Sequence, residues 1–517
     1  MAAISGTFRT VGRPGLLVVS AAVLLAIVAL LVPFGYVLSS LVTTGWSNAV
    51  DLIFRPRVGE LLLNTVGLVV VTVPLCVALG VGLAWAIERT DLPGAAFWGP
   101  LFAAPLAVPA FVNSYAWIST IPSLHGLWSG VLVATLSYFP LVYLPAAATM
   151  RRLDPAVEES ARALGSSALG VFLRVVLPQL RLAMLGGGLL IGLHLLAEYG
   201  AFQMLRFDTF TVAIFEQYQS TYNGSAGSML ANVLVLCCLV LLIAEASGRG
   251  RARYYRVGSG AARPPVRIHL RLSTVPVLLG LLGVAVLALG VPLWTIARWL
   301  RIGGSAVWDV PAFSAALGQT LGFAVAGAAI TTLLAFPVAW VAVRSSSVFA
   351  RTVEGANYIT ASLPGIVTAL ALATVTIHYA RPLYQTVVMV VTAYVLMFLP
   401  QALVSLRSGL AQVPIGLEEA SRSLGKAGVA TFVRVTARLM APSAAAGAAL
   451  VFVAVTTELT ATLLLAPTGT QTLSTAFWSF SYGLDFAGAA PYALIMIVLT
   501  LPVTYVLFTQ SRKLAAA

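Results

Sequence analysis

The sequence predicts an all-α polytopic membrane protein with about twelve transmembrane helices, arranged as two homologous six-helix halves. Three features lead to this prediction: the composition, the number and length of the apolar stretches, and a polar segment that occurs twice. Of the 517 residues, 59% are hydrophobic and 9% are charged. Soluble domains carry about a quarter charged residues, so this composition excludes an ordinary soluble protein.

Twelve apolar stretches are long enough to cross a bilayer, for which a helix needs about 20 residues. Those of the first half lie at about 15–38, 61–87, 97–118, 127–149, 183–205 and 228–246. Those of the second half lie at about 274–297, 315–343, 355–378, 383–406, 441–463 and 489–510. Several contain proline or glycine, which membrane helices tolerate where neighbouring groups satisfy the freed backbone.

The basic residues are distributed unevenly between alternate loops. With 30 Lys and Arg against 17 Asp and Glu, the formal net charge is +13. If both termini lie on one side of the membrane, most of the basic residues fall on that side. The positive-inside rule then places both termini in the cytoplasm. Membrane topology accounts for the positive charge, and no nucleic-acid partner is expected.

One pattern runs through the chain twice. EESARALGSSALGVFLRVVLPQL (158–180) and EEASRSLGKAGVATFVRVTARLM (418–440) align at a spacing of 260 residues. The same spacing pairs Glu198 with Glu458 in the apolar stretch that follows each copy. We therefore expect an internal duplication. Its expected parts are a first half at 1–246 with a core at about 60–246, a linker at 247–273, and a second half at 274–517 with a core at about 315–510.

The linker is rich in arginine and has no acidic residue. We interpret it as a cytoplasmic tether between the halves, with contact to anionic lipids as the alternative.

The repeated polar segment predicts a helical elbow that projects from the membrane. Asp154 is a candidate N-cap, followed by Pro155 at the first helical position. Glu158 and Arg162 are four residues apart, as are Glu418 and Arg422, and such pairs support a short helix. Gly165 then ends this helix before a second one begins. Its presence in both halves favours a docking surface for a cytoplasmic partner over a well-capped loop.

The spacing within these elbows resembles that of the membrane subunits of bacterial ABC importers. That family has Glu-Ala-Ala, then three residues, Gly, nine residues, Ile, one residue and Leu-Pro. The first copy fits at Glu159, Ser160, Ala161, Gly165, Val175, Leu177 and Pro178. The second fits at Glu419, Ala420, Ser421, Gly425 and Val435. In this copy Ala437 and Arg438 replace the Leu-Pro, so its helix is expected to leave the membrane at a different angle.

The resemblance implies a type I importer permease fold in the bacterial plasma (inner) membrane. It also implies two copies of a cytoplasmic ABC ATPase subunit and an extracytoplasmic substrate-binding protein as partners. The chain lacks the G-x-x-x-x-G-K-[ST] phosphate-binding loop, so ATP and Mg²⁺ are expected on the ATPase. This chain is then neither an enzyme nor the holder of a cofactor. The residues implied to couple it to the ATPase are Glu158, Glu159, Ala161, Gly165, Pro178, Glu418, Glu419, Ala420 and Gly425.

Four further stretches resemble fused two-domain ferric-iron permeases. They are AEYGAFQMLRFDTFTVAIFEQY (197–218), TELTATLLLAPTGTQTLSTAFW (457–478), PLAVPAFVNSYAWIS (105–119) and SLPGIVTALAL (362–372). The resemblance implies ferric iron as the substrate. Permeases for thiamine, aminoethylphosphonate, polyamines, sulfate or molybdate share weaker versions of these motifs and stay open as alternatives. No cluster of residues indicates iron by itself, and no metal site is assigned.

Glu198 and Glu458 are carboxylates within predicted spans, where charge is costly and by default functional. If its span begins near Ala183, Glu198 lies about 22 Å along the helix, near the outer surface. We interpret Glu198 and Glu458, with the neighbouring His194 and Tyr199, as candidate residues of the translocation pathway or its gate. Alternatively, each glutamate bonds nearby backbone or hydroxyl groups to hold the gate and touches no substrate.

Two other classes of protein remain as alternatives. A secondary active transporter with 6+6 helices also shows twelve spans and a duplication, but it does not explain two elbows. A polytopic membrane enzyme requires a nucleophile, a base or a metal cluster, and the sequence shows no such constellation. The elbows therefore favour the importer permease.

Overall fold

The computed structural model describes residues 13–219, 224–249, 267–344, 355, 357, 359–426 and 428–516. Within these ranges the chain is helical, and the only extended pairing is an isolated bridge between Thr90 and Ile268. This agrees with the predicted all-α class.

The helices of the first part of the chain follow one another with short connections. They are α2 (Arg13–Thr44), α3 (Trp46–Ile53), α4 (Pro56–Arg89), α5 (Ala95–Ala103), α6 (Ala110–Thr120), α7 (Gly126–Tyr138), α8 (Pro140–Arg152), α9 (Pro155–Ala163), α10 (Ala168–Val171), the π-helical turn η2 (Phe172–Val176), α11 (Leu177–Gln179), α12 (Arg181–Ala197), α13 (Gly200–Met204), α14 (Phe210–Gln219) and α15 (Gly224–Arg249).

The second part repeats much of this order. Its helices are α16 (Thr274–Ala285), α17 (Val291–Gly303), α18 (Val310–Arg344), α20 (Gly365–Tyr379), α21 (Val387–Ala411), α22 (Ile415–Ser423), α23 (Gly428–Thr431), the π-helical turn η7 (Phe432–Thr436), α24 (Ala437–Thr456), α25 (Thr460–Leu465), α26 (Leu473–Tyr482) and α27 (Phe486–Ala516).

Among the described residues, eight helices are long and apolar enough to cross a membrane, or up to ten if two sharply bent pairs each form one span. The predicted stretch at 15–38 lies within α2, a helix of 32 residues, and the described end of the stretch at 355–378 lies within the apolar helix Gly365–Tyr379. The protein is thus a polytopic all-α membrane protein. The described part of the chain supports fewer full-length spans than the twelve that were predicted.

The contacts divide the chain into two compact units that do not follow the order of the sequence. Unit 1 comprises Met1–Ile53, Asn223–Val235 and Asp309–Ala476, and unit 2 comprises Phe54–Tyr222, Leu236–Trp308 and Phe477–Ala517. Each unit therefore contains residues from both predicted halves.

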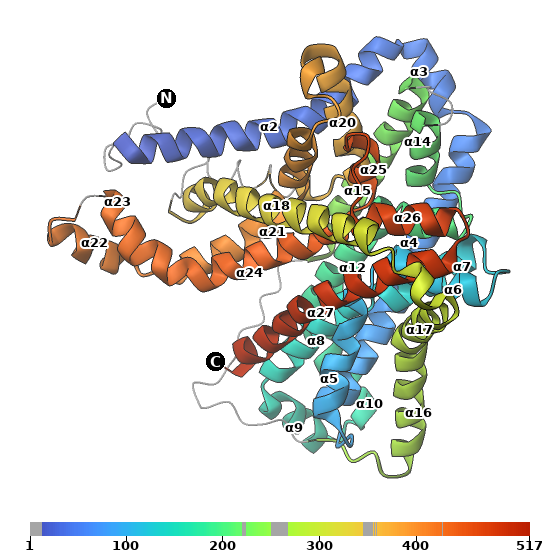
Figure 1. Cartoon of the computed structure of the whole chain (residues 1–517). Helices are drawn as coiled ribbons and strands as arrows, with labels where there is room; N and C mark the ends of the chain where they lie inside the picture. The colour runs from blue at the N-terminus through green and yellow to red at the C-terminus, as the bar shows by residue number, and fades with distance from the viewer. Residues whose placement is uncertain are drawn as a thin grey trace. The chain divides into compact units, whose positions relative to one another are not determined.

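In unit 1, the helices α18, α21 and α24 pack on one another and lie side by side in Figure 1. The first helix of the described residues, α2, packs on α18 and on α20 of this unit. The helices on which α2 packs thus lie about three hundred residues later in the sequence.

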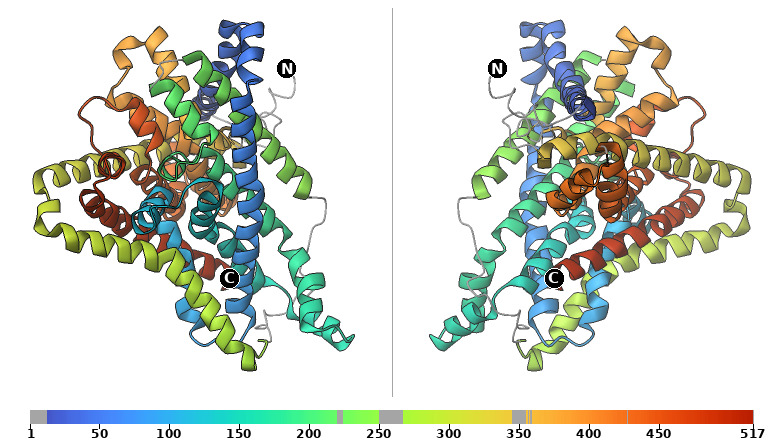
Figure 2. Two further views of the ribbon diagram at one scale, coloured as in Figure 1. Left: turned by 90° about the vertical axis from the view of Figure 1, so that its right-hand side faces the viewer. Right: turned by 90° about the vertical axis from the view of Figure 1, so that its left-hand side faces the viewer.

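Unit 2 is built on α4, α8 and α12, the counterparts of α18, α21 and α24 in the repeat. Figure 2 shows α4, in blue, as one long continuous helix. Glycines allow these helices to approach closely, because a Cβ added at Gly187 of α12 would lie 2.8 Å from the Leu141 carbonyl oxygen of α8. From the later part of the chain, α17 packs on α6 and on α27.

Candidate functional site

The first elbow has the capping that its sequence predicts. The Asp154 carboxylate accepts a hydrogen bond from the Ala156 amide at 3.0 Å at the start of α9. After α9 the backbone turns at Gly165, whose φ of +85° lies in the left-handed region that favours glycine. Ser167 then caps α10, accepting from the Gly170 amide at 3.1 Å. The second elbow turns at Gly425 with a φ of +79°.

The predicted pairing along each elbow helix is wrong for Glu158. Its carboxylate does not pair with Arg162 but lies 2.8 Å from Arg89 Nη2, at the end of α4. Burial disfavours a charge that lacks an oppositely charged partner. The side chain of Arg89 is only 2% exposed, and its pairing with Glu158 therefore gives both buried charges a partner. The side chain of Arg422 lies outside the described part of the second elbow.

The second elbow repeats this buried ion pair. Arg344, at the end of α18, donates from Nη2 to Glu418 Oε1 at 2.7 Å. The same nitrogen donates to the Val413 carbonyl oxygen at 3.1 Å, and Thr436 donates its hydroxyl to Glu418 Oε1 at 3.1 Å. Arg89 and Arg344 were missed from the sequence. The available signal was that each is an arginine at the end of an apolar span, 255 residues apart.

The other predicted coupling residues mostly face outward. Both elbows thus have a charged inner side held to a membrane helix and an outer side open to a partner. The predicted coupling residues that are exposed are Glu159, Gly165, Pro178, Glu419, Ala420 and Gly425, and Ala161 is half-buried.

Aromatic side chains support each elbow from the membrane helix. Trp85 of α4 packs edge-on against Phe172 with ring centroids 5.9 Å apart, and Trp340 of α18 does the same with Phe432 at 6.4 Å. Phe172 and Phe432 each begin a π-helical turn, a feature that is frequent at functional sites. The sequence offers no simple signal for these turns.

The two elbows leave their π-helical turns differently. In the first, Ala168–Gln179 and Arg181–Ala197 are bent by 65°, whereas Phe432–Thr456 of the second forms one apolar helix. Pro178 lies two residues before the break at Leu180, and proline removes a backbone donor and disfavours a straight helix. Arg438 at the matching position carries an amide, so the second helix continues.

Glu198 and Glu458 lie just beyond the helices in which they were predicted. The predicted spans 183–205 and 441–463 are interrupted, because α12 ends at Ala197 and α24 ends at Thr456. Each carboxylate caps the short helix that follows. Glu198 Oε1 accepts from the Ala201 amide at 3.0 Å, and Glu458 Oε1 accepts from the Ala461 amide at 2.8 Å.

Glu458 is bound more completely than Glu198 by its own short helix. Its Oε2 also accepts from the Thr462 amide at 3.0 Å and from the Thr462 hydroxyl at 2.7 Å. That hydroxyl lies 2.7 Å from the phenolic oxygen of Tyr394. In the first half, Tyr138 at the end of α7 donates directly to Glu198 Oε2 at 3.0 Å. These contacts are of the kind that the structural alternative expects, and a role in translocation stays a prediction.

The two other candidate pathway residues differ in their surroundings. The exposed His194 packs against Tyr138 with ring centroids 5.4 Å apart, so Tyr138 joins His194 to Glu198. Tyr199 is buried instead, stacked on Phe215 at 4.2 Å and tilted against Trp478 at 5.3 Å. Tyr199 is therefore a packing residue behind the first carboxylate. Tyr138 was missed, because at the repeat spacing of 260 residues it matches Phe398, and the repeat therefore gives no signal for it.

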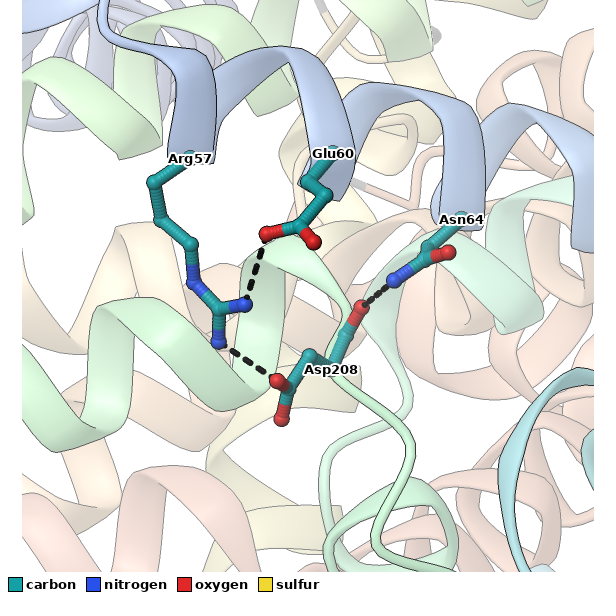
Figure 3. Close-up of polar contacts among 4 residues, drawn as sticks. All are labelled: Arg57, Glu60, Asn64 and Asp208. Carbon is teal, nitrogen blue, oxygen red and sulfur yellow. Dashed lines mark hydrogen bonds and ion pairs between the residues drawn. The ribbon is translucent and has the colours of Figure 1, made fainter.

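The loop after α13 is held to the start of α4 by charged groups (Figure 3). Arg57 pairs with Glu60 at 3.0 Å and also with Asp208, while the Asn64 side chain donates to the Asp208 carbonyl oxygen at 3.0 Å. The second half uses neutral groups here, with Gln319 Oε1 accepting from the Gln471 amide at 2.9 Å. Within the described residues, no three His, Cys, Asp or Glu side chains come together as metal ligands.

The end of the linker is fixed beside the first elbow. The Ile268 amide donates to the Arg89 carbonyl oxygen at 2.8 Å, and Asp91 Oδ1 accepts from the Leu270 amide at 2.9 Å. His269 Nδ1 lies 2.8 Å from Asp91 Oδ2. These bonds from Leu270 and His269 hold the pKa of Asp91 below its ordinary value. The remaining predicted linker, residues 250–266, lies outside the described part.

Comparison with known proteins gives matches over both halves. The family described as "Binding-protein-dependent transport system inner membrane component" matches residues 42–253 and 332–515. The Fe(3+)-transport system permease protein FbpB 2 of Haemophilus influenzae is 36% identical over 472 residues, which cover 91% of this chain and 93% of that protein.

Shorter relatives match less of the chain. The sulfate transport system permease protein CysW of Synechocystis sp. is 28% identical over 202 residues, covering 35% of this chain and 72% of that protein. The sulfate transport system permease protein CysT of Salmonella typhimurium is 26% identical over 235 residues, covering 41% of this chain and 84% of that protein.

Proposed function

The chain belongs to the family of inner-membrane components of binding-protein-dependent transport systems, and on that premise we propose that it is the permease of an ATP-driven importer of ferric iron. The observation that carries the substrate is the 36% identity to a Fe(3+)-transport system permease protein over 91% of this chain. The sulfate permeases match only 35% and 41% of the chain, so sulfate has weaker support.

Coupling to ATP is proposed to run through the elbows. Each elbow receives one copy of a cytoplasmic ABC ATPase subunit, which holds ATP and Mg²⁺. Three observations support this assignment: the elbows occur twice, they expose Glu159 and Glu419, and the chain has no phosphate-binding loop of its own. The positive-inside distribution supports cytoplasmic elbows and cytoplasmic termini.

The proposed mechanism is alternating access. A loaded binding protein docks at the side opposite the elbows, on loops such as 39–60, 206–227 and 464–488. ATP brings the two ATPase subunits together and displaces the elbows, and the helices attached to them open the pathway outward. Hydrolysis resets the cycle. Glu198 and Glu458, placed where α12 and α24 end, are the proposed gate residues, with His194 next to the first of them.

Transport by the reconstituted system tests the substrate. The chain, its ATPase and its binding protein are placed in proteoliposomes, and uptake of radioactive ferric iron is compared with uptake of radioactive sulfate. The proposal expects ATP-dependent iron uptake and no sulfate uptake. Sulfate uptake without iron uptake would overturn the substrate. Failure of the ATPase to co-purify with the chain would overturn the importer mechanism and favour a secondary transporter.

A further inference from the structure

In each unit, two helices connect the elbow to the gate glutamate. The first connection is covalent, because α12 runs from the elbow to Ala197, next to Glu198, and α24 ends two residues before Glu458. The second is built from side chains on α4 and on α18. The elbow and the gate of each unit are therefore joined by two separate helices.

The elbow end of the second connection is the buried ion pair. Arg89 ties Glu158 to α4, and Arg344 ties Glu418 to α18. Their side chains are 2% and 13% exposed, and those of the two glutamates 11% and 4%. Replacing a buried ion pair by apolar residues is often neutral or stabilising. Stability alone therefore does not explain why both halves have these charges. A need to hold each elbow at one position on its membrane helix does explain them.

The gate end of this connection is also repeated. Thr65 of α4 accepts from the Phe210 amide at 3.3 Å, and Thr320 of α18 accepts from the Leu473 amide at 2.7 Å. Phe210 and Leu473 are the first residues of α14 and α26. The next residues return to the gate, since Thr211 donates to the Glu198 carbonyl oxygen at 2.6 Å. Ser474 does the same to the Glu458 carbonyl oxygen, also at 2.6 Å.

The spacing of these contacts is the same in both units. Arg89 follows Thr65, and Arg344 follows Thr320, by 24 positions each, which corresponds to about 36 Å along a helix. Both α4 and α18 continue as one helix over this length, each through a single internal proline (Pro74 and Pro337), and each can therefore carry a displacement from one end to the other.

We infer that Arg89 and Arg344 are positioning residues. Each joins its elbow to a second helix that also contacts the gate, so that the elbow, the two helices and the gate form one closed frame. Displacement of the elbow then moves both helices of the frame together. The frame of unit 2 consists of Glu158, Arg89, α4, Thr65, Thr211, Glu198 and α12. The frame of unit 1 consists of Glu418, Arg344, α18, Thr320, Ser474, Glu458 and α24. The inference rests on the proposed function, since it assigns the force on the elbow to the ATPase.

Charge removal at the elbow end tests the frame. The double variant Arg89→Met with Glu158→Leu leaves no unpaired buried charge, and its response to the binding protein is measured relative to its own basal ATP hydrolysis. Stimulation of hydrolysis by the loaded binding protein should fall by about fivefold or more, the lower end of typical coupling between sites. The swapped pair, Arg89→Glu with Glu158→Arg, should restore part of it.

The neighbouring ion pair between Glu88 and Arg151 provides a matched control. It joins α4 to α8 at the same end of the helix and does not involve an elbow residue. Glu88→Leu with Arg151→Met should therefore leave stimulation unchanged. If the ion pairs only support the structure, the elbow double variant and the Glu88–Arg151 double variant should reduce stimulation equally. That result would overturn the inference.

The gate end gives an independent test if the elbow variant fails to assemble. Thr65→Val with Thr320→Val removes both hydroxyl acceptors and leaves the elbows intact. The frame predicts normal ATPase binding with fewer substrate ions imported per ATP hydrolysed, whereas unchanged stoichiometry contradicts it. Loss of stimulation in the wild-type complex itself would instead refute the proposed function, so the two failures are distinguishable.

Discussion

At the scale of residues, the two consecutive glutamates of each elbow have opposite surroundings. Glu158 is buried against Arg89, and Glu159 is exposed. Glu158→Ala should cost about 3–5 kcal/mol of stability because it leaves a buried arginine unpaired. Glu159→Ala should change stability by about 0.5 kcal/mol or less and weaken capture of the ATPase. Thermal unfolding in detergent and co-purification separate the effects, and equal behaviour of the two variants would contradict this division of roles.

The gate carboxylates give a second prediction at this scale. Glu198→Gln with Glu458→Gln keeps a carbonyl oxygen that can cap α13 or α25, but it removes both charges. If the charges serve translocation, uptake falls while binding of the ATPase persists. The control is Tyr199→Phe, which retains the buried ring stacked on Phe215. If the double glutamine variant transports at the wild-type rate, the two glutamates only cap the helices α13 and α25 and their charges have no role in translocation.

The sequence was informative about which residues have special chemistry and uninformative about their partners. Charged residues in an apolar chain stand out, so Glu158, Glu198 and their repeats could be found. Their partners could not, because helical periodicity indicates the face of a side chain but not the helix packed against it. Arg89 lies 69 positions before Glu158, and only the packing of α4 against the elbow brings them together.

At the scale of elements, the glycine turns should decide the shape of the elbows. Gly165 and Gly425 have positive φ, and an added Cβ would meet nothing within 4 Å at either position. Gly165→Val with Gly425→Val should therefore cost about 1–2 kcal/mol per site through backbone strain rather than clash. Co-purification with the ATPase should fall. Asparagine, which tolerates this conformation better, is the control, and it should retain more of the ATPase than valine does.

The attachment of the linker should depend on pH through Asp91. Its pKa is lowered in the folded protein, so its bonds stabilise the fold above the ordinary aspartate pKa of about 3.9 and are lost as the pH falls through the lowered value. Hydrogen exchange at the Leu270 amide, corrected for intrinsic rate, should stay slow at neutral pH and accelerate only in strong acid. In Asp91→Asn the rate should show no such acid transition. A transition above pH 5 would contradict the lowered pKa.

Helix boundaries were predicted well where a capping residue or a glycine in the sequence determines them, and poorly where a helix ends within an apolar run. Asp154 and Gly165 determine the start and end of α9 within a few residues, and the sequence places both. The breaks after Ala197 and Thr456 fall inside continuous apolar runs, so hydropathy extends the spans across them. What ends these helices is a carboxylate that binds the next turn, which apolar composition does not reveal.

At the scale of the whole molecule, duplication and packing divide the chain in different ways. The repeat runs along the sequence, and the ion pairs, caps and π-helical turns recur in both halves. Hydropathy gives no information on which spans exchange between units, since every span has the same apolar character. The placement of α2 with α18 and α20, and of α17 with α6 and α27, follows from packing that the pattern leaves undetermined.

This exchange predicts that each half depends on the other even without a covalent linker. If the chain is expressed as 1–257 and 258–517, the second fragment keeps the Leu270 contact to Asp91. The two should assemble and restore uptake, because each unit draws helices from both fragments. The first fragment alone leaves α2 without α18 and α20, and the second alone leaves α17 without α6, so either fragment by itself should be degraded. Stable accumulation of one fragment by itself, monodisperse in detergent, would contradict the exchange.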